Sequence, residues 1–249
     1  MTCVYWLEQT EADVPAENDW LSLSEAARLN DMHIAKRRAD WRLGRWTAKR
    51  ALATYPKLSG HPPALADIEV RAEPSGAPEV FLANQPAAIT ISLSHRAGVA
   101  ICAVAPPGVA LGCDLEVIEP RSNAFLADYF TAEEQALVAQ AAADDRPRLL
   151  ALLWSGKESA LKALRAGLRA DTRCVVVCPV EKRPANDRQG HADHPILSAG
   201  SAHQRNIWCP LNVRHTSGAI FHGWWQNTDT FLRTLVAAPP PAAPILLAD

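Results

Sequence analysis

Apolar and polar positions alternate along several short stretches of the first half, and one longer stretch has a helical pattern. The alternation predicts strands at residues 3–8, 67–71, 79–82, 89–93 and 99–104. The helical pattern runs from Glu25 to about Ala53, and Ser22 with Glu25 has the spacing of a capping box at its start. Tyr55-Pro56 ends this helix, because proline cannot continue one.

The second half contains the same kinds of elements. In order, they are a strand at 110–118, a helix from the capping box Thr131–Glu134 to about 143, a helix at about 148–165, a strand at 174–180, a polar loop at 181–205, and a hairpin of 207–213 and 219–225. Gly167 stands where a left-handed residue would end the second of these helices.

The clearest internal break is Pro106-Pro107-Gly108. Strands and a long helix occur on both sides of it. We therefore expect an α/β (α+β) protein with an N-terminal half at 1–108 and a C-terminal half at 109–236. The segment 237–249 is rich in Ala and Pro, and we expect it to be disordered.

Composition narrows the class of function. The 249 residues carry a net charge of −2, so no overall positive field draws the chain to nucleic acid. There is no run of about 18 apolar residues to span a membrane, and residues 1–10 lack the pattern of a signal peptide. We expect a cytoplasmic protein without a membrane partner. The six cysteines include no CxxC pair, and we expect reduced thiols.

A short acidic motif follows the internal break. In Leu111-Gly-Cys-Asp-Leu-Glu-Val-Ile118, strand alternation places Asp114 and Glu116 on one face, with Gly112 beside them. The two carboxylates lie about 7 Å apart along a strand. Mg²⁺ favours one or two carboxylates together with phosphate oxygens and water. The motif predicts a magnesium site, although it also fits an edge strand with a solvated acidic face.

A second motif lies on the predicted helix at 148–165. Trp154, Glu158 and Lys162 are spaced i, i+4, i+8 and share one helical face. In the functional interpretation, Glu158 is a third carboxylate for the metal and Lys162 contacts a phosphate oxygen, while Trp154 anchors the helix. The alternative is an exposed Glu–Lys pair that contributes only about 0.3–0.5 kcal/mol.

Two groups of residues in the first half fit a phosphate ligand. Ser94-His95-Arg96 forms a predicted turn after a strand, and its three side chains can all donate hydrogen bonds to phosphate oxygens. The densest basic cluster of the chain lies on the first helix and consists of Lys36, Arg37, Arg38, Arg42, Arg45, Lys49 and Arg50. The plainer alternatives are a structural histidine and a solvated basic face.

Taken together, these motifs resemble the 4'-phosphopantetheinyl transferase superfamily in its long, surfactin-synthetase-associated form. The matching pieces stand in the family's order: Gly44-Arg45 with Ala48-Lys49, Ser94-His95, Gly112-Cys-Asp-Leu-Glu116, which is similar to GxDxE, and Trp154-Ser-Gly-Lys-Glu-Ser-Ala-Leu-Lys162, which is similar to WxxKExxxK. GxDxE alone is weak, whereas the ordered pair of motifs is specific. The resemblance covers roughly residues 20–180.

The resemblance implies two pseudo-symmetric halves with an active site between them, and transfer of the phosphopantetheine arm of coenzyme A to a carrier-protein serine. It implies that Asp114, Glu116 and Glu158 bind Mg²⁺, that Glu158 is also the base, and that Lys162 stabilises the phosphate. The coenzyme A-binding residues that it implies are Lys36, Arg38, Arg45, Ser94, His95, Asp114 and Lys162. The partners would be an acyl or peptidyl carrier protein and coenzyme A, with no nucleic acid, and the long form usually works as a monomer.

The chain departs from the family pattern at one place. Gly76-Ala77-Pro78 stands where the family often has Gly-Lys-Pro. We hypothesise that Arg96 supplies the missing positive charge to coenzyme A. Arg165 and Arg169 flank Gly167 and are expected to contact an acidic carrier protein.

Two other functions fit parts of the pattern. A non-catalytic module that binds carrier proteins and keeps the same fold would have lost a carboxylate of the motifs, and none is lost. An RNA-binding protein would use the basic helix with Trp41 and Trp46, but the net charge is not basic.

Overall fold

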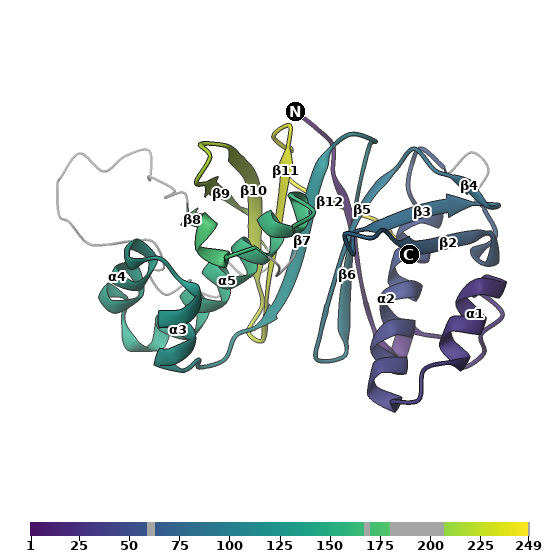
Figure 1. The fold of residues 1–249 in the computed structure, drawn as a ribbon, viewed down its shortest axis with the longest axis horizontal. Helices are drawn as coiled ribbons and strands as arrows, with labels where there is room; N and C mark the ends of the chain where they lie inside the picture. The colour runs from purple at the N-terminus through teal and green to yellow at the C-terminus, as the bar shows by residue number, and fades with distance from the viewer. Residues whose placement is uncertain (59–62, 167–169, 180–206, 249) are drawn as a thin grey trace.

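The structure is a computed structural model of the chain, and it describes residues 1–58, 63–166, 170–179 and 207–248. Helices and strands occur in both halves, so the α/β class predicted from the sequence is confirmed (Figure 1). No helix in the described segments has both the length and the apolar character needed to cross a membrane. The loop predicted at 181–205 lies outside the described residues.

In the N-terminal half, helix α2 packs on a sheet with the strand order β12-β1-β6-β5, and on the small sheet β2-β3-β4. Leu52 of α2, Leu7 of β1 and Val104 of β6 meet in the core between them. The elements are β1 (Tyr5–Thr10), α1 (Leu23–Asn30), α2 (Ala35–Ala53), β2 (Ile68–Ala72), β3 (Pro78–Leu82), β4 (Gln85–Pro86), β5 (Thr90–Arg96) and β6 (Val99–Ala105).

In the C-terminal half, helix α5 packs on one face of a sheet with the order β7-β11-β10-β9-β8. Leu152 of α5, Val177 of β8 and Leu232 of β11 belong to this core. The elements are β7 (Ala110–Val117), α3 (Asn123–Tyr129), α4 (Ala132–Gln140), α5 (Arg146–Ala163), β8 (Val175–Pro179), β9 (Cys209–His215), β10 (Ile220–Asn227), β11 (Phe231–Ala238) and the late strand β12 (Ile245–Leu246), which joins the first sheet.

The two large sheets lie face to face between α2 and α5 (Figure 1). Ile101 of β6 and Cys113 and Leu115 of β7 share the core between the sheets, whereas Cys102, next to Ile101, packs toward α2. At the seam, the Cys113 amide donates to Ser92 Oγ on β5 at 2.9 Å. The layers are therefore helix, sheet, sheet and helix, with β5 and β7 side by side where the halves meet.

The expectation of a disordered segment at 237–249 is wrong for its described part. Strand β11 extends into it, and β12 pairs in parallel with Tyr5 and Trp6 of β1. The Ile245 and Leu247 amides donate to carbonyl oxygens of Val4 and Trp6, and Leu247 is 5% exposed. The Ala- and Pro-rich composition misled the prediction, because backbone pairing with β1 orders this segment and Leu247 fills a place in the N-terminal core.

The helix predicted from Glu25 to Ala53 is two helices, although the capping box of Ser22 and Glu25 is confirmed. The chain turns after α1, which folds back on α2. Trp20 and Leu29 then pack with Trp41 and Trp46. Burying this aromatic cluster is the physical reason for the break.

Helix α5 ends earlier than predicted, and the residue with a left-handed backbone is Arg165, with φ 54°. The Arg165 amide donates to the Lys162 carbonyl at 2.9 Å, and the Ala166 amide donates to the Leu161 carbonyl at 3.0 Å. These are the two hydrogen bonds of a Schellman motif. Gly167 lies outside the described residues.

Gly112 allows β7 to approach α5 more closely than any other residue type would. A Cβ atom at this position would lie 1.7 Å from the Ser159 carbonyl oxygen on α5. The obstacle is helix backbone, so no side-chain rotation can relieve the overlap. Gly112 therefore sets the distance between the strand with Asp114 and the helix with Glu158.

We expect Gly112→Ala to lower the free energy of unfolding by about 3 kcal/mol or more, because α5 must move away from β7. Urea unfolding followed by circular dichroism measures this loss. Gly44→Ala is the matched control, because a Cβ there meets nothing closer than His95 at 4.0 Å, and alanine favours the helix. Equal stability of the two variants would show that β7 and α5 are not held at this distance.

Candidate active site

Asp114 and Glu116 lie on the face of β7 that points toward α5, as strand alternation predicts. Both are buried, with exposed fractions of 4% and 9%. The alternative of a solvated acidic face is therefore wrong. Burial of two carboxylates costs free energy unless charged or hydrogen-bonding partners surround them.

Asp114 is bonded from both halves of the molecule. Its Oδ1 accepts hydrogen bonds from Ser94 Oγ and from Lys162 Nζ, each at 2.8 Å. Lys162 also donates to the Cys113 carbonyl at 3.0 Å. The other oxygen, Oδ2, is buried and has no hydrogen-bond partner among the described residues. Asp114 thus presents one unsatisfied oxygen inside the site.

Glu116 is held by two nitrogen donors from outside its own strand. Its Oε1 accepts from the Trp154 indole at 3.1 Å, and its Oε2 accepts from Arg121 at 2.9 Å. Arg96 lies farther away, with its Nε 3.8 Å from Oε2. Trp154 therefore anchors α5, as predicted, and also binds a carboxylate of the acidic motif.

Glu158 lies one turn before Lys162 on α5 and is partly buried. Burial, and then the negative charge of Asp114, raise its pKa from 4.5 to about 7, although Lys162 acts in the opposite direction. Burial and Asp114 also raise the pKa of Glu116. A carboxyl group with this pKa can both accept and release a proton near neutral pH.

These residues fit a divalent cation, but they do not form a finished ligand set. No three His, Cys, Asp or Glu side chains are grouped as metal ligands among the described residues. Two observations nevertheless favour a cation: the unpartnered Oδ2 of Asp114, and the raised pKa of Glu158, which results first from burial and then from the negative charge of Asp114. Asp114, Glu116 and Glu158 would hold Mg²⁺ after side-chain rotation, with phosphate oxygens and water completing its shell.

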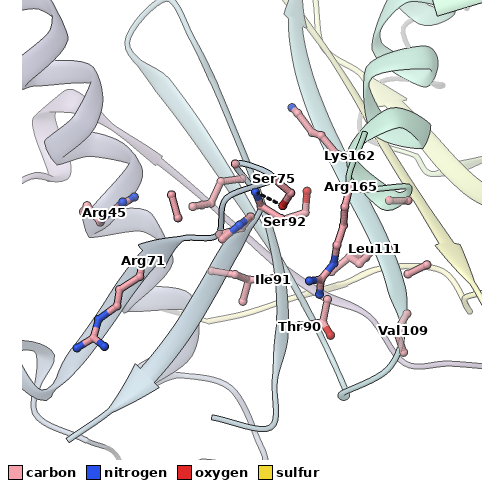
Figure 2. A pocket seen from close by; sticks show the side chains of 17 residues that line it. Arg45, Arg71, Ser75, Thr90, Ile91, Ser92, Val109, Leu111, Lys162 and Arg165 are labelled. Carbon is pink, nitrogen blue, oxygen red and sulfur yellow. Dashed lines mark hydrogen bonds between the residues drawn. The ribbon is translucent and has the colours of Figure 1, made fainter. Parts of the chain in front are cut away.

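A cavity of about 360 Å³ adjoins this group at the seam between the halves (Figure 2). Lys162 and Arg165 border it from the end of α5, while Arg45 of α2 and Arg71 of β2 border it from the N-terminal half. Lys162 therefore contacts the Asp114 carboxylate and lines the cavity at the same time. The four basic residues make the cavity suitable for a polyanion.

The structure does not bring Arg96 to the cavity that Ala77 lines. Arg96 lies at the far end of β5, where it pairs with Glu119 at 3.2 Å and faces Glu116. Ala77 instead borders the cavity, together with Arg71 and Arg165. The cations near the position of the missing lysine are thus different from the one that we hypothesised.

Ser94 and His95 lie within β5 rather than in a turn, and the turn comes at Ala97-Gly98 with positive φ angles. Strand alternation sends Ser94 toward Asp114 and His95 toward α2, where it faces Gly44. Ser94 and His95 therefore point to opposite faces of the strand and do not form a catalytic pair. His95 is exposed.

The basic cluster of α2 is mostly engaged with the protein itself. Arg38 donates to the Leu29 and Met32 carbonyls, and Arg45 lies over the Trp41 ring and 3.6 Å from Glu25. Lys36 is exposed on the first turn. The cluster is therefore neither a uniform solvated face nor a uniform ligand surface.

Of the two arginines expected to contact a carrier protein, the structure describes Arg165. Arg165 is half exposed and forms an ion pair with Glu73 of the N-terminal half. This pair spans the border of the cavity. Arg169 lies outside the described residues.

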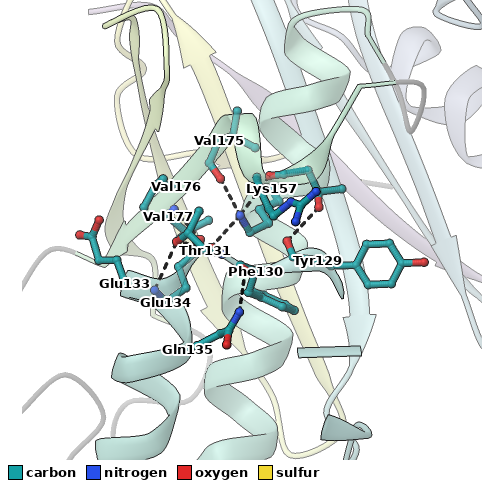
Figure 3. Close-up of polar contacts among 12 residues, drawn as sticks. Tyr129, Phe130, Thr131, Glu133, Glu134, Gln135, Lys157, Val175, Val176 and Val177 are labelled. Carbon is teal, nitrogen blue, oxygen red and sulfur yellow. Dashed lines mark hydrogen bonds and ion pairs between the residues drawn. The ribbon is translucent and has the colours of Figure 1, made fainter. Parts of the chain in front are cut away.

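A buried ion pair next to Glu158 holds α5 in place (Figure 3). Lys157 is fully buried, and its Nζ lies 2.7 Å from Glu134 and 3.0 Å from the Thr172 carbonyl. Glu134 also accepts from the amides of Thr131 and Val177. One carboxylate thus links the capping box of α4, helix α5 and strand β8.

The N-terminal half contains the same arrangement. Lys49 is fully buried, with its Nζ 2.6 Å from Glu25 and 2.8 Å from the Trp20 carbonyl. Glu25 accepts from the amides of Ser22 and Val70. We had assigned Lys49 to the basic cluster. The spacing of tryptophan and lysine, Trp46-Thr-Ala-Lys49 and Trp154-Ser-Gly-Lys157, is a repeat in the sequence that could have identified both buried lysines.

The matching buried pairs show that the two halves are built alike.

A comparison with known protein families finds a match in the C-terminal half. The family model of the 4'-phosphopantetheinyl transferase superfamily matches residues 110–208. This part of the chain is therefore similar to that superfamily. A search of curated proteins finds no match. The matched region contains both motifs of the transferase resemblance, the strand with Asp114 and the helix with Glu158.

We expect Lys157→Met to lower the free energy of unfolding by about 3–5 kcal/mol, because it leaves Glu134 buried without its cation. Adding Glu134→Gln should recover part of this loss, since glutamine can still close the capping box. Urea unfolding of the two single variants and the double variant measures the coupling. Lys36→Met, on the exposed first turn of α2, is the control. A loss of stability below about 1 kcal/mol is the size expected for a surface substitution. A loss that small for Lys157→Met, close to that of Lys36→Met, would contradict the anchoring role.

The pKa of Glu158 predicts a pH dependence of stability in the metal-free protein. With a folded pKa of about 7 and an ordinary value of 4.5, the folded state binds a proton that the unfolded state has released between these two pH values. Folded stability should therefore fall as pH rises through this window. Glu158→Gln should remove that part of the slope.

Urea unfolding at several pH values in the presence of a chelator tests this. Glu133→Gln, at an exposed carboxylate, should leave the slope as it is in the parent protein. Parallel profiles for the parent and Glu158→Gln would mean that Glu158 is not proton-coupled to folding.

Proposed function

We propose that this protein transfers the 4'-phosphopantetheine group from coenzyme A to a serine of an acyl or peptidyl carrier protein and releases 3',5'-ADP. The observation that carries the proposal is the position of Lys162. It bonds to Asp114 at 2.8 Å and lines the basic cavity at the seam. A diphosphate in that cavity would therefore lie between the buried carboxylates and the surrounding cations.

In the proposed reaction, the serine oxygen forms a bond to the β-phosphorus of coenzyme A, and the bond from that phosphorus to the 3',5'-ADP oxygen breaks. Glu158 takes the proton of the serine hydroxyl, directly or through water, since a pKa of about 7 suits a base at neutral pH. Lys162 stabilises the negative charge that grows on the leaving 5'-phosphate of 3',5'-ADP. Mg²⁺, when bound, supplies further charge stabilisation at the phosphate oxygens.

The residues proposed for coenzyme A fall into two groups. Arg45 and Lys162 line the cavity, and Asp114 lies behind Lys162. The others lie on α2 and β5, outside the lining of the cavity, and are Lys36, Arg38, Ser94, His95 and Arg96. Ser94 and Arg38 already donate to protein acceptors, so we propose that they shape the site.

Carrier docking is proposed near the end of α5, at Arg165 and Arg169. An acidic carrier surface would compete with Glu73 for Arg165. Binding of the carrier would then loosen an ion pair that joins the halves at the border of the cavity. A carrier-binding protein without catalysis is the alternative, and the transfer assay decides between the two.

We expect an apo carrier protein incubated with this protein, coenzyme A and Mg²⁺ to gain the mass of one phosphopantetheine group by mass spectrometry. Asp114→Asn and Glu158→Gln should each slow the gain by roughly a hundredfold or more, because a positioned base or charge is lost. Glu133→Gln is the surface control. No mass gain on any carrier, with carrier binding retained, would favour the non-catalytic alternative.

A further inference from the structure

We propose that Arg121 is the resident counter-cation of the carboxylate site, and that a metal ion must displace it from Glu116 in order to bind. The inference deepens the proposed function, on which it rests, and concerns how the metal enters. Its evidence is the set of contacts around Glu116 and Asp114.

Arg121 is the nearest positive charge to Glu116. Its Nη2 lies 2.9 Å from Glu116 Oε2 and 3.2 Å from Glu119 Oε1. The guanidinium also lies over the Phe125 ring, 5.3 Å from its centroid. Arg121 is therefore fixed by two carboxylates and an aromatic face at once.

Arg96 is a weaker candidate for the same role. It lies 3.8 Å from Glu116, and its side chain is 43% exposed, compared with 22% for Arg121. Water screens an exposed ion pair strongly, so the closer and less exposed pair has the larger effect. Arg96 supports Arg121 and does not replace it.

The same substitution of a protein cation for a metal occurs at Asp114, where Lys162 binds Oδ1. Both carboxylates of the strand motif thus have protein cations as partners. This agrees with the observation that no three ligating side chains are grouped among the described residues. A metal entering the site gains Glu116 only by breaking its contact with Arg121. The consequence is a reduced affinity for the metal alone.

Calorimetry with Mn²⁺ in the absence of coenzyme A tests the proposal. Arg121→Gln should bind Mn²⁺ roughly tenfold more tightly than the parent, because Glu116 is released and one positive charge is lost. Arg121→Lys keeps the charge and should stay close to the parent. Arg214→Gln is the matched control: Arg214 pairs with an exposed Glu133 elsewhere on the domain, and its loss should change the affinity little.

A second measurement follows Glu116 itself. Its Oε1 accepts from the Trp154 indole, so capture of Glu116 by a metal should shift the indole proton resonance of Trp154 during a Mg²⁺ titration. Trp154→Phe assigns the signal. The shift should occur at about tenfold lower Mg²⁺ in Arg121→Gln. This readout is valid whether or not the protein catalyses transfer.

The outcomes separate the two proposals. Tighter Mn²⁺ binding by Arg121→Gln without any transfer activity in the parent supports the counter-cation and rejects the transferase. Transfer in the parent with unchanged Mn²⁺ affinity in Arg121→Gln rejects the counter-cation alone. An equal gain in Arg214→Gln, an unmoved indole resonance at saturating Mg²⁺, or no metal binding by either protein also overturns it.

Discussion

The candidate site depends on a buried carboxylate–lysine pair that it does not contain. Glu134 binds Lys157 at 2.7 Å, and it also accepts from the amides of Thr131 and Val177. Because Lys157 cannot leave this environment without exposing a buried charge, α5 cannot rotate about its axis. The next residue, Glu158, is thereby directed toward β7, and Lys162 follows one turn later.

The N-terminal half uses the same device with a different result. Counted from the buried lysines, Arg50 occupies the place of Glu158, and Thr54 occupies the place of Lys162. The framework is thus repeated, whereas the carboxylate and the lysine of the site are present in one copy. This separates residues that build the fold from residues that perform chemistry. Lys157 belongs to the first kind and Glu158 to the second, although they are neighbours in one motif.

Local patterns in the sequence predicted much of this framework. Both capping boxes, the acidic strand and the motif helix could be identified because each depends on residues close together in the chain. The burial of Lys49 could not, because its partners Glu25 and the Trp20 carbonyl come from elsewhere in the fold. Helix α3, which has only seven residues, and the whole of strand β11 lie outside the elements predicted from the sequence.

The motifs indicate which residues belong to the site, whereas only the fold shows which of them are in contact. Asp114, Glu158 and Lys162 lie together as the motifs indicate. The relation of Arg96 to Ala77 could not be read from the chain, because it depends on which end of β5 faces the cavity. Arg121 belongs to none of the sequence motifs, and only the folded structure places it beside Glu116.

The parallel pairing of β12 with β1 has a consequence for how the protein is made. The N-terminal sheet is completed by Ile245 and Leu246, which are synthesised long after every other strand of that sheet. While the chain is still emerging from the ribosome, β1 is therefore an open edge that can pair with other chains. The first half is not an autonomous folding unit in this sense, and its last strand arrives only after the second half has been made.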